Sequence, residues 1–315
     1  MDTPDLYPAI EPHTAGFLPV SGGHRVYYEV CGNPEGRPAV YLHGGPGAGC
    51  NPNLRRFFDP AAYRIILFDQ RGAGRSTPAA SLENNTTRNL IADMEALRNH
   101  LGVRRWLVLG GSWGSTLALV YAAAHPDACR ALVLRGVWLC RRADLRWWFF
   151  GRRKVYPDHW REFAQHVPAA ERADLLKAYF QRLIHPDPGV HMPAAVAWRT
   201  YETRCDTLLP RENLDIPANT QTLAIARLEA HYKSNMAFLA EGELLDGVPR
   251  FRHIPGVIIH GRYDMSCSLD GAMALSDAWP EAAFSIVADA GHSAMEPGIR
   301  ERLVAATDRF RDITD

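Results

Sequence analysis

The stretch Gly110–Gly114, which reads GGSWG, constrains the fold of this chain more than any other. An apolar run at 106–109 precedes it, and an Ala/Leu-rich run at 115–124 follows it and stops before His125 and Pro126. This order predicts a strand, a sharp turn and a helix, the context in which a G-x-S-x-G sequence presents a serine nucleophile. The glycines leave room for the backbone to close around a serine at strained φ and ψ angles. The pentapeptide alone would also suit an ordinary glycine-rich turn.

Length and composition narrow the choice of fold and partner. With 315 residues, of which 47% are apolar and 22% charged, the chain can form one large α/β domain or a core with an insertion. Lys+Arg and Asp+Glu both number 35, so the net charge of +0 argues against a nucleic-acid or anionic-membrane partner. No apolar stretch is long enough to span a membrane, and the first residues lack the pattern of a signal peptide. We therefore expect a cytoplasmic protein whose six scattered cysteines are reduced thiols, not a zinc site.

Short apolar runs alternate with helical patterns over most of the chain. The runs that predict strands are 25–30, 39–42, 64–68, 106–109, 131–136, 257–260 and 284–287, after an N-terminal arm. Helical periodicity covers 87–101 and 298–313. Because the connections are short and strands alternate with helices, we expect an α/β fold with a mostly parallel sheet.

The hydrophobic pattern changes between residues 141 and 247. Strand-like runs are absent from this stretch, and helical patterns such as 171–184 and 218–241 replace them. We therefore predict a core formed by 1–140 and 248–315, with 141–247 inserted as a helical cap. Open α/β sheets bind ligands beyond the carboxyl ends of their strands, so such a cap can shape the pocket.

Three residues that follow predicted strands form a candidate catalytic triad. Ser112, Asp264 and His292 occur in the chain order expected for an α/β-hydrolase, and all three fall at the same edge of the sheet. A serine hydroxyl needs a base to remove its proton, a role that we assign to His292, oriented by Asp264. His260 is a rival base, although its apolar neighbours favour a satisfied core residue. Asp289 is a rival acid, but it lies too close to His292 in sequence.

A second glycine-rich loop, 43–47 (HGGPG), follows the predicted strand at 39–42. Such a loop can turn bare backbone N–H groups toward a ligand. We expect the N–H groups of Gly45 and Trp113 to form the oxyanion hole, although ordinary turn chemistry is the alternative for the loop taken alone. The later stretch 69–76 lacks the lysine of a phosphate-binding loop, so we interpret Asp69 and Arg71 as structural.

These motifs resemble those of the proline iminopeptidases, serine peptidases of the α/β-hydrolase superfamily. The similarity runs nearly end to end and rests on five stretches: 43–47, 69–76, 110–119, 261–264 and 289–294. It implies an α/β-hydrolase core with an inserted cap, and release of N-terminal proline from peptides without a metal or cofactor.

The resemblance also implies two substrate-binding carboxylates in the cap. Glu202 follows an aromatic residue, and Glu229 lies in a stretch that reads RLEAHY, as in the family. An exopeptidase must bind a free ammonium group, and a desolvated pair of carboxylates can do this through charge-assisted hydrogen bonds. From composition alone, both glutamates would be ordinary surface residues.

Several positions depart from the family pattern. Tyr201 stands where the family has tryptophan, and Lys233 stands where it has an aromatic residue. Trp138 and Phe149 align with the aromatic wall of the proline pocket, where phenylalanine and tyrosine are expected. These changes bear on the strictness of the proline preference and not on catalysis.

Two other functions compete with an aminopeptidase. A carboxylesterase or amidase could use the same triad with altered N-terminal specificity. A non-catalytic binding protein could retain the fold, but the triad and both oxyanion loops are present here. Serine at 112 also separates the chain from epoxide hydrolases and haloalkane dehalogenases, which carry aspartate at the elbow.

Overall fold

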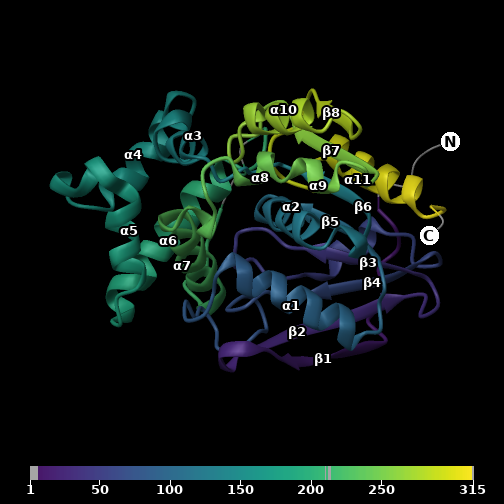
Figure 1. Cartoon of the computed structure of the whole chain (residues 1–315). Helices are drawn as coiled ribbons and strands as arrows, with labels where there is room; N and C mark the ends of the chain where they lie inside the picture. Colours follow the sequence, from purple (N-terminus) through teal and green to yellow (C-terminus); the bar gives the residue numbers. More distant parts are fainter. Residues whose placement is uncertain (1–5, 210, 212–213, 314–315) are drawn as a thin grey trace.

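The computed structural model describes residues 6–209, 211 and 214–313. Its strands form one sheet in the order β1-β2-β4-β3-β5-β6-β7-β8 (Figure 1). β1 pairs with β2 and β2 with β4 in antiparallel fashion, and the remaining pairs are parallel. The strands are β1 (Thr14–Pro19), β2 (Arg25–Gly32), β3 (Arg37–Leu42), β4 (Tyr63–Phe68), β5 (Trp106–Gly111), β6 (Cys129–Arg135), β7 (Gly256–Gly261) and β8 (Ala283–Val287). The predicted α/β fold with a mostly parallel sheet is confirmed.

Each strand predicted from an apolar run is present within a few residues of its expected bounds. The difference lies at the N-terminus, where part of the predicted arm is the edge strand β1. Its residues are mostly exposed, and Gly16 and Pro19 interrupt any apolar pattern, so no local signal predicted a strand there. Pairing with β2 supplies the hydrogen bonds that order this segment.

Helices cover both faces of the sheet, because alternate residues of each buried strand point to opposite sides. Val40 and Ile66 pack on one face with α1 (Thr87–His100), α2 (Trp113–Ala124) and α10 (Leu269–Ala278). Tyr41 and Ile65 pack on the other face with α11 (Pro297–Phe310).

The described residues between β6 and β7 are helical wherever they have regular structure, and most of them lie to one side of the sheet (Figure 1). The main helices of this segment are α3 (Arg142–Arg146), α4 (Pro157–Gln165), α5 (Leu175–Leu183), α6 (Pro188–Arg204) and α7 (Thr220–Ser234). An aromatic cluster fills its interior, with Phe163 stacked on Tyr179 at 4.3 Å and on Tyr201 at 4.5 Å between ring centroids. We call the segment α3–α7 the cap.

Two short helices follow the cap before β7, namely α8 (Glu243–Asp246) and α9 (Val248–Phe251). Leu244 and Phe251 both pack into the core cluster beside α2, although residue 244 lies within the predicted insertion. The boundaries at 140/141 and 247/248 therefore stay a prediction.

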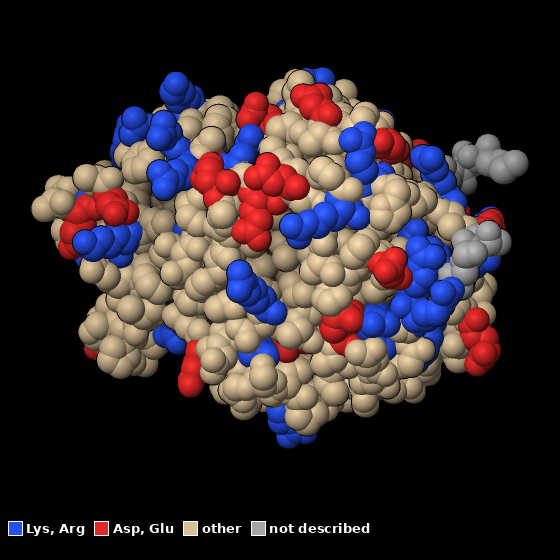
Figure 2. Space-filling model, viewed as in Figure 1, with Lys and Arg blue, Asp and Glu red and all other residues tan. Residues whose placement is uncertain are grey.

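The surface carries charges of both signs in separate places. Figure 2 shows basic side chains gathered over the α3 end of the cap and acidic ones nearby over α8. The first group comes from a stretch rich in arginine and lysine, 141–154, and the second includes Glu243 and Asp246. In the described part of the chain, none of the helices has the length and apolar character that crossing a membrane requires.

Candidate active site

Ser112 lies at the sharp turn between β5 and α2, as predicted. Its φ of 59° and ψ of −126° are strained for a residue with a Cβ atom. A Cβ at Gly110 would lie 2.1 Å from the carbonyl oxygen of Gly114, and one at Gly114 would lie 2.0 Å from that of Leu42. Both positions therefore need glycine, because a side chain at either would push the elbow away from β3 and from its own helix.

Asp264 and His292 meet beyond the ends of β7 and β8. Nδ1 of His292 lies 2.7 Å from Oδ2 of Asp264, and both side chains are buried. The other oxygen, Oδ1, accepts hydrogen bonds from the N–H groups of Ser266 and Cys267 at 3.0 and 2.7 Å. Burial raises the pKa of Asp264, but His292 and these hydrogen bonds outweigh it and hold the pKa below its usual value. The carboxylate is therefore ionised and ready to orient the imidazole.

Arg135, at the end of β6, fixes the form of His292. One guanidinium nitrogen lies 3.2 Å from Nε2 of His292 and donates to its backbone oxygen at 2.8 Å. Because a guanidinium can only donate, Nε2 is the acceptor and Nδ1 carries the proton that faces Asp264. This is the tautomer that a general base for Ser112 needs, but the lone pair on Nε2 faces Arg135 here, so that contact must open before Nε2 can take the serine proton. Within the described residues no hydrogen bond joins Ser112 Oγ to Nε2, and such contacts often tighten only when substrate binds.

One rival residue lies beside the candidate triad, because Nε2 of His260 is 3.5 Å from Oδ2 of Asp264. His260 is buried, with the N–H of Val137 donating to Nδ1 at 3.2 Å and Nε2 2.9 Å from the carbonyl oxygen of Cys267. Asp289 is exposed. Atoms of the kinds that bind metals lie within 4.8 Å of one another in Asp264, Cys267 and His292. The hydrogen bond between Asp264 and His292 already explains why these side chains lie close together.

The loop after β3 lies against the elbow. A Cβ at Gly44 would lie 3.1 Å from Cβ of Ser112, which shows how closely the two backbones approach. Gly45 has a φ of 104°, which favours glycine. Trp113 begins α2, so its N–H belongs to the free end of that helix.

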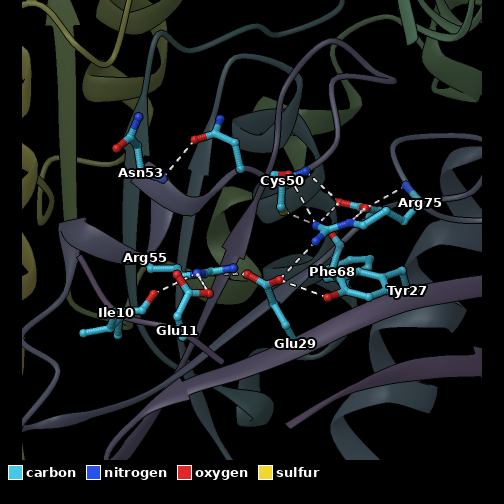
Figure 3. Close-up of polar contacts among 11 residues, drawn as sticks. Ile10, Glu11, Tyr27, Glu29, Cys50, Asn53, Arg55, Phe68 and Arg75 are labelled. Atoms are coloured by element: carbon cyan, nitrogen blue, oxygen red, sulfur yellow. Dashed lines mark hydrogen bonds and ion pairs between the residues drawn. The ribbon is translucent and has the colours of Figure 1, made fainter. Parts of the chain in front are cut away.

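An ionic network around the buried carboxylates of Glu29 and Asp69 braces the far end of this loop (Figure 3). Glu29 of β2 accepts from Arg55 at 2.8 Å and from Arg75 at 3.1 Å. Asp69 accepts from the backbone N–H of Cys50 at 2.6 Å and from the side chain of Arg75 at 2.7 Å. Asp69 thus has the bracing role that the sequence indicated. Arg71 likewise makes a buried ion pair, in which its Nε lies 2.6 Å from Asp93.

A cavity of about 310 Å³ is shared by the candidate catalytic residues and the cap. Its lining includes Gly45, Ser112 and His292 together with Glu202 and Glu229 of the cap. Glu202, from α6, makes an ion pair with Arg199 one turn before it. The structure thus places both predicted cap carboxylates beside the predicted nucleophile.

Glu229, on α7, is fully buried and only half satisfied. Its Oε2 accepts from Nε1 of Trp198 at 2.8 Å and from Nζ of Lys233 at 3.0 Å. Its Oε1 is buried and has no hydrogen-bond partner among the described residues. Since a buried carboxylate oxygen without a donor is costly, this atom favours a ligand that brings a proton donor.

The predicted aromatic wall lies behind the cavity and does not line it. Nζ of Lys233 lies 5.4 Å from the ring of Trp138, 5.0 Å from that of Trp148 and 5.6 Å from that of Trp198. We call these three rings the tryptophan cage. Phe149 packs on Trp148 within the cap core. That Trp138 and Phe149 contact the substrate ring stays a prediction.

Comparison with known proteins places this site in a family. Residues 38–298 match the family model described as alpha/beta hydrolase fold. The chain is 49% identical over 314 residues to a proline iminopeptidase of Xylella fastidiosa, with 97% of this chain and 99% of the relative covered. It is 49% identical to a proline iminopeptidase of Arabidopsis thaliana, of which 82% is covered. The chain belongs to the proline iminopeptidase family of α/β hydrolases.

Solved structures of α/β hydrolases share the fold. A proline iminopeptidase of Mycobacterium smegmatis superposes with a TM-score of 0.60 over 95% of this chain and 99% of its own, at 21% identity. An esterase of Exiguobacterium antarcticum superposes with a TM-score of 0.64 over 95% of this chain and 100% of its own, at 20% identity. At these identities the similarity supports the architecture alone, and it is as strong for an esterase as for a family member.

Sequence reasoning missed three polar residues of this iminopeptidase-family site, namely Arg135, Arg199 and Asp206, all of which line the cavity. The backbone oxygen of Asp206 accepts from the N–H groups of His292 and Ser293 at 2.9 and 2.8 Å, so the segment after α6 holds the histidine loop. Arg135 ends a predicted strand on the catalytic edge, a position that could have marked it. Nothing local distinguishes Arg199 or Asp206 from surface residues.

Proposed function

We propose that this protein is a serine aminopeptidase that releases N-terminal proline from peptides through an acyl-enzyme. The observation that carries the proposal is the shared cavity, which is lined by Ser112 and His292 and also by the cap carboxylates Glu202 and Glu229. Membership of the proline iminopeptidase family supports the same substrate.

In this mechanism Ser112 attacks the first carbonyl carbon of the peptide while Nε2 of His292 takes its proton. The N–H groups of Gly45 and Trp113 bind the oxyanion of the tetrahedral intermediate. His292 then gives the proton to the leaving amine, and the prolyl ester remains on Ser112. Water, deprotonated by His292, attacks this ester and releases proline.

The cap carboxylates select for a free N-terminus. The unpartnered Oε1 of Glu229 accepts a hydrogen bond from the substrate ammonium, and Glu202 supplies a second acceptor as its pairing with Arg199 loosens. Lys233 holds the other oxygen of Glu229, so the carboxylate keeps one atom for the substrate. A blocked N-terminus lacks both the charge and the donors that this arrangement requires.

The test is to compare kcat/KM for proline β-naphthylamide, alanine β-naphthylamide and a short-chain p-nitrophenyl ester. A strong preference for the proline amide is the expected result. Good ester turnover with little amide cleavage would contradict the aminopeptidase assignment while leaving the triad in place.

One observation favours the alternative, a carboxylesterase or amidase. Both cap carboxylates already have a cationic partner, Arg199 for Glu202 and Lys233 for Glu229. If these pairs hold in solution, an incoming ammonium gains little charge stabilisation. The turnover of the p-nitrophenyl ester in the same comparison distinguishes an esterase from an aminopeptidase.

A further inference from the structure

The two loops that carry the proposed oxyanion donors are joined by one buried side chain that the mechanism does not use. Gln70 follows β4 and is almost fully buried. Its Nε2 donates to the backbone oxygen of His43 at 2.9 Å, and its Oε1 accepts from the indole Nε1 of Trp113 at 2.8 Å. His43 lies two residues before Gly45, and Trp113 directly follows Ser112.

The orientation of the Gln70 amide is fixed by chemistry. An indole N–H can only donate and a backbone carbonyl can only accept, so Oε1 must face Trp113 and Nε2 must face His43. Removing either Nε2 or Oε1 of this amide would leave its buried polar partner without a hydrogen bond. Such an unsatisfied group costs more free energy than the hydrogen bond itself contributes. Gln70 therefore fixes the distance between the loop that carries Gly45 and the turn that carries Trp113.

The backbone of Gln70 adds a third link to the same loop. Its N–H donates to Nε2 of His43 at 3.0 Å, and Nδ1 of His43 lies 3.0 Å from the carbonyl oxygen of Gly44. Because Nε2 accepts, Nδ1 carries the proton and donates to Gly44, so the imidazole is neutral. Burial lowers the pKa of His43, in agreement with this form. The conformation of the loop just before Gly45 thus depends on residue 70 through both backbone and side chain.

The ionic network of Figure 3 acts on a different part of the loop. Asp69 holds the N–H of Cys50, beyond the glycines, whereas Gln70 holds the His43 end and alone reaches Trp113. The two neighbouring residues therefore have separable effects. One anchors the loop to the core, and the other couples it to the elbow.

We propose that Gln70 is a positioning residue of the oxyanion hole, which sets the separation of the N–H groups of Gly45 and Trp113 by bridging the loops that carry them. This inference rests on acyl transfer by Ser112, as proposed above, but not on the preference for proline. Donors in such a hole stabilise the transition state only when they are aimed in advance at the developing charge, and displacements of about 1 Å can cost about 100-fold in rate. Loss of Gln70 should therefore lower kcat and leave the binding of the ground state nearly unchanged.

The principal variant is Gln70→Glu, assayed at a pH where the carboxyl is ionised, which keeps the shape and the acceptor for Trp113 but then has no donor for His43. We expect kcat to fall by about 10- to 100-fold and KM to change by less than about 3-fold. The inhibition constant of a prolinal-type aldehyde, which forms a tetrahedral oxyanion on Ser112, should rise by the same factor as kcat falls. The inhibition constant of free proline, a ground-state ligand, should stay the same. The matched control is Gln165→Glu on the exposed face of α4, which should alter neither.

A purely structural role for Gln70 would give another result. Losses that fall equally on aldehyde and proline binding, or a folded variant with unchanged kcat, would overturn the proposal. If Gln70→Glu does not fold, Trp113→Phe decides, because it keeps the ring and the backbone N–H but removes the bond to Oε1. That variant should lower kcat at constant KM, and unchanged kcat would refute the coupling.

The assays use both the proline amide and the p-nitrophenyl ester, so that the two proposals fail separately. Ester turnover without release of proline would refute the proposed substrate while the Gln70 test proceeds on the ester. A wild-type protein that turns over neither substrate would refute the oxyanion hole and Gln70's role in it together.

Discussion

Nζ of Lys233 lies 3.0 Å from Oε2 of Glu229 one turn earlier on α7, and both side chains are buried. The lysine thus points into the protein, toward the tryptophan cage, and not into solvent. The cation occupies the face of each ring, where a positive charge is favoured. The site therefore contains its own ammonium group beside the carboxylate that is proposed to bind the substrate's.

The buried pair predicts a large effect of removing one partner. Lys233→Met would leave the charge of buried Glu229 without its cation, so we expect the free energy of unfolding to fall by about 3 kcal/mol. Arg182→Met is the control, because Arg182 pairs with Glu171 at 2.6 Å on a partly exposed surface and should cost less than about 1 kcal/mol. Urea unfolding measures both variants. Equal losses would mean that the Lys233 pair is no stronger than a surface one.

Glu202→Gln should separate recognition of the N-terminus from catalysis. A charge-assisted hydrogen bond contributes about 1.5–3 kcal/mol, so kcat/KM for proline β-naphthylamide should fall by about 10- to 100-fold. The p-nitrophenyl ester has no ammonium group, and its turnover should change by less than about 3-fold. Glu162→Gln, which breaks an exposed ion pair with Arg204, serves as the control. Equal losses on both substrates would remove Glu202 from ammonium binding.

The sequence predicted the catalytic edge of the sheet because each element there has a local signal. The strands at 106–111 and 256–261 are fully buried apolar runs, and the residues that follow them are punctuated by glycine. The elbow needs Gly110 and Gly114 for steric reasons that act within a few residues. Ser112, Asp264 and His292 could thus be placed together from topology alone.

The parts that sequence did not reveal depend on partners far away in the chain. Gln70 reads as one polar residue in a loop, and only folding brings it to His43 and Trp113, 27 and 43 residues away. The direction of Lys233 depends on Trp138 and Trp148, which come from another part of the chain. Neither periodicity nor spacing records such contacts.

The strained backbone of Ser112 predicts that replacing this residue by glycine abolishes activity and raises the stability of the fold. Ser112→Ala should lower kcat by about four orders of magnitude or more and leave the fold intact. Ser112→Gly should be equally inactive, yet unfold at a higher urea concentration than Ser112→Ala. Glycine adopts a φ of 59° and ψ of −126° without the strain of about 1–3 kcal/mol that a Cβ causes. Its greater entropy in the unfolded chain offsets about 0.4–1 kcal/mol of that gain. A lower midpoint for the glycine variant would show that the elbow is not strained, and comparable turnover in either variant would refute the role of Ser112.

Buried histidines predict a loss of stability in mild acid. Burial lowers the pKa of His43 and of His260, so each is neutral in the folded protein at a pH where it is already protonated in the unfolded chain. Between the lowered folded value and the unfolded value of about 6.5, the unfolded state binds more protons, so stability rises with pH in that window. The contribution of these two residues is thus nearly complete about one pH unit above the unfolded value, partly lost at about pH 6.5 and lost further as the pH falls. Urea unfolding at pH 7.5, 6.5 and 5.5 should give a midpoint that falls slightly over the first step and more over the second. His260→Asn should flatten this dependence, whereas His13→Asn, at an exposed position, should not. A wild-type midpoint that stays constant down to pH 5.5 would show that neither imidazole is held neutral by the fold.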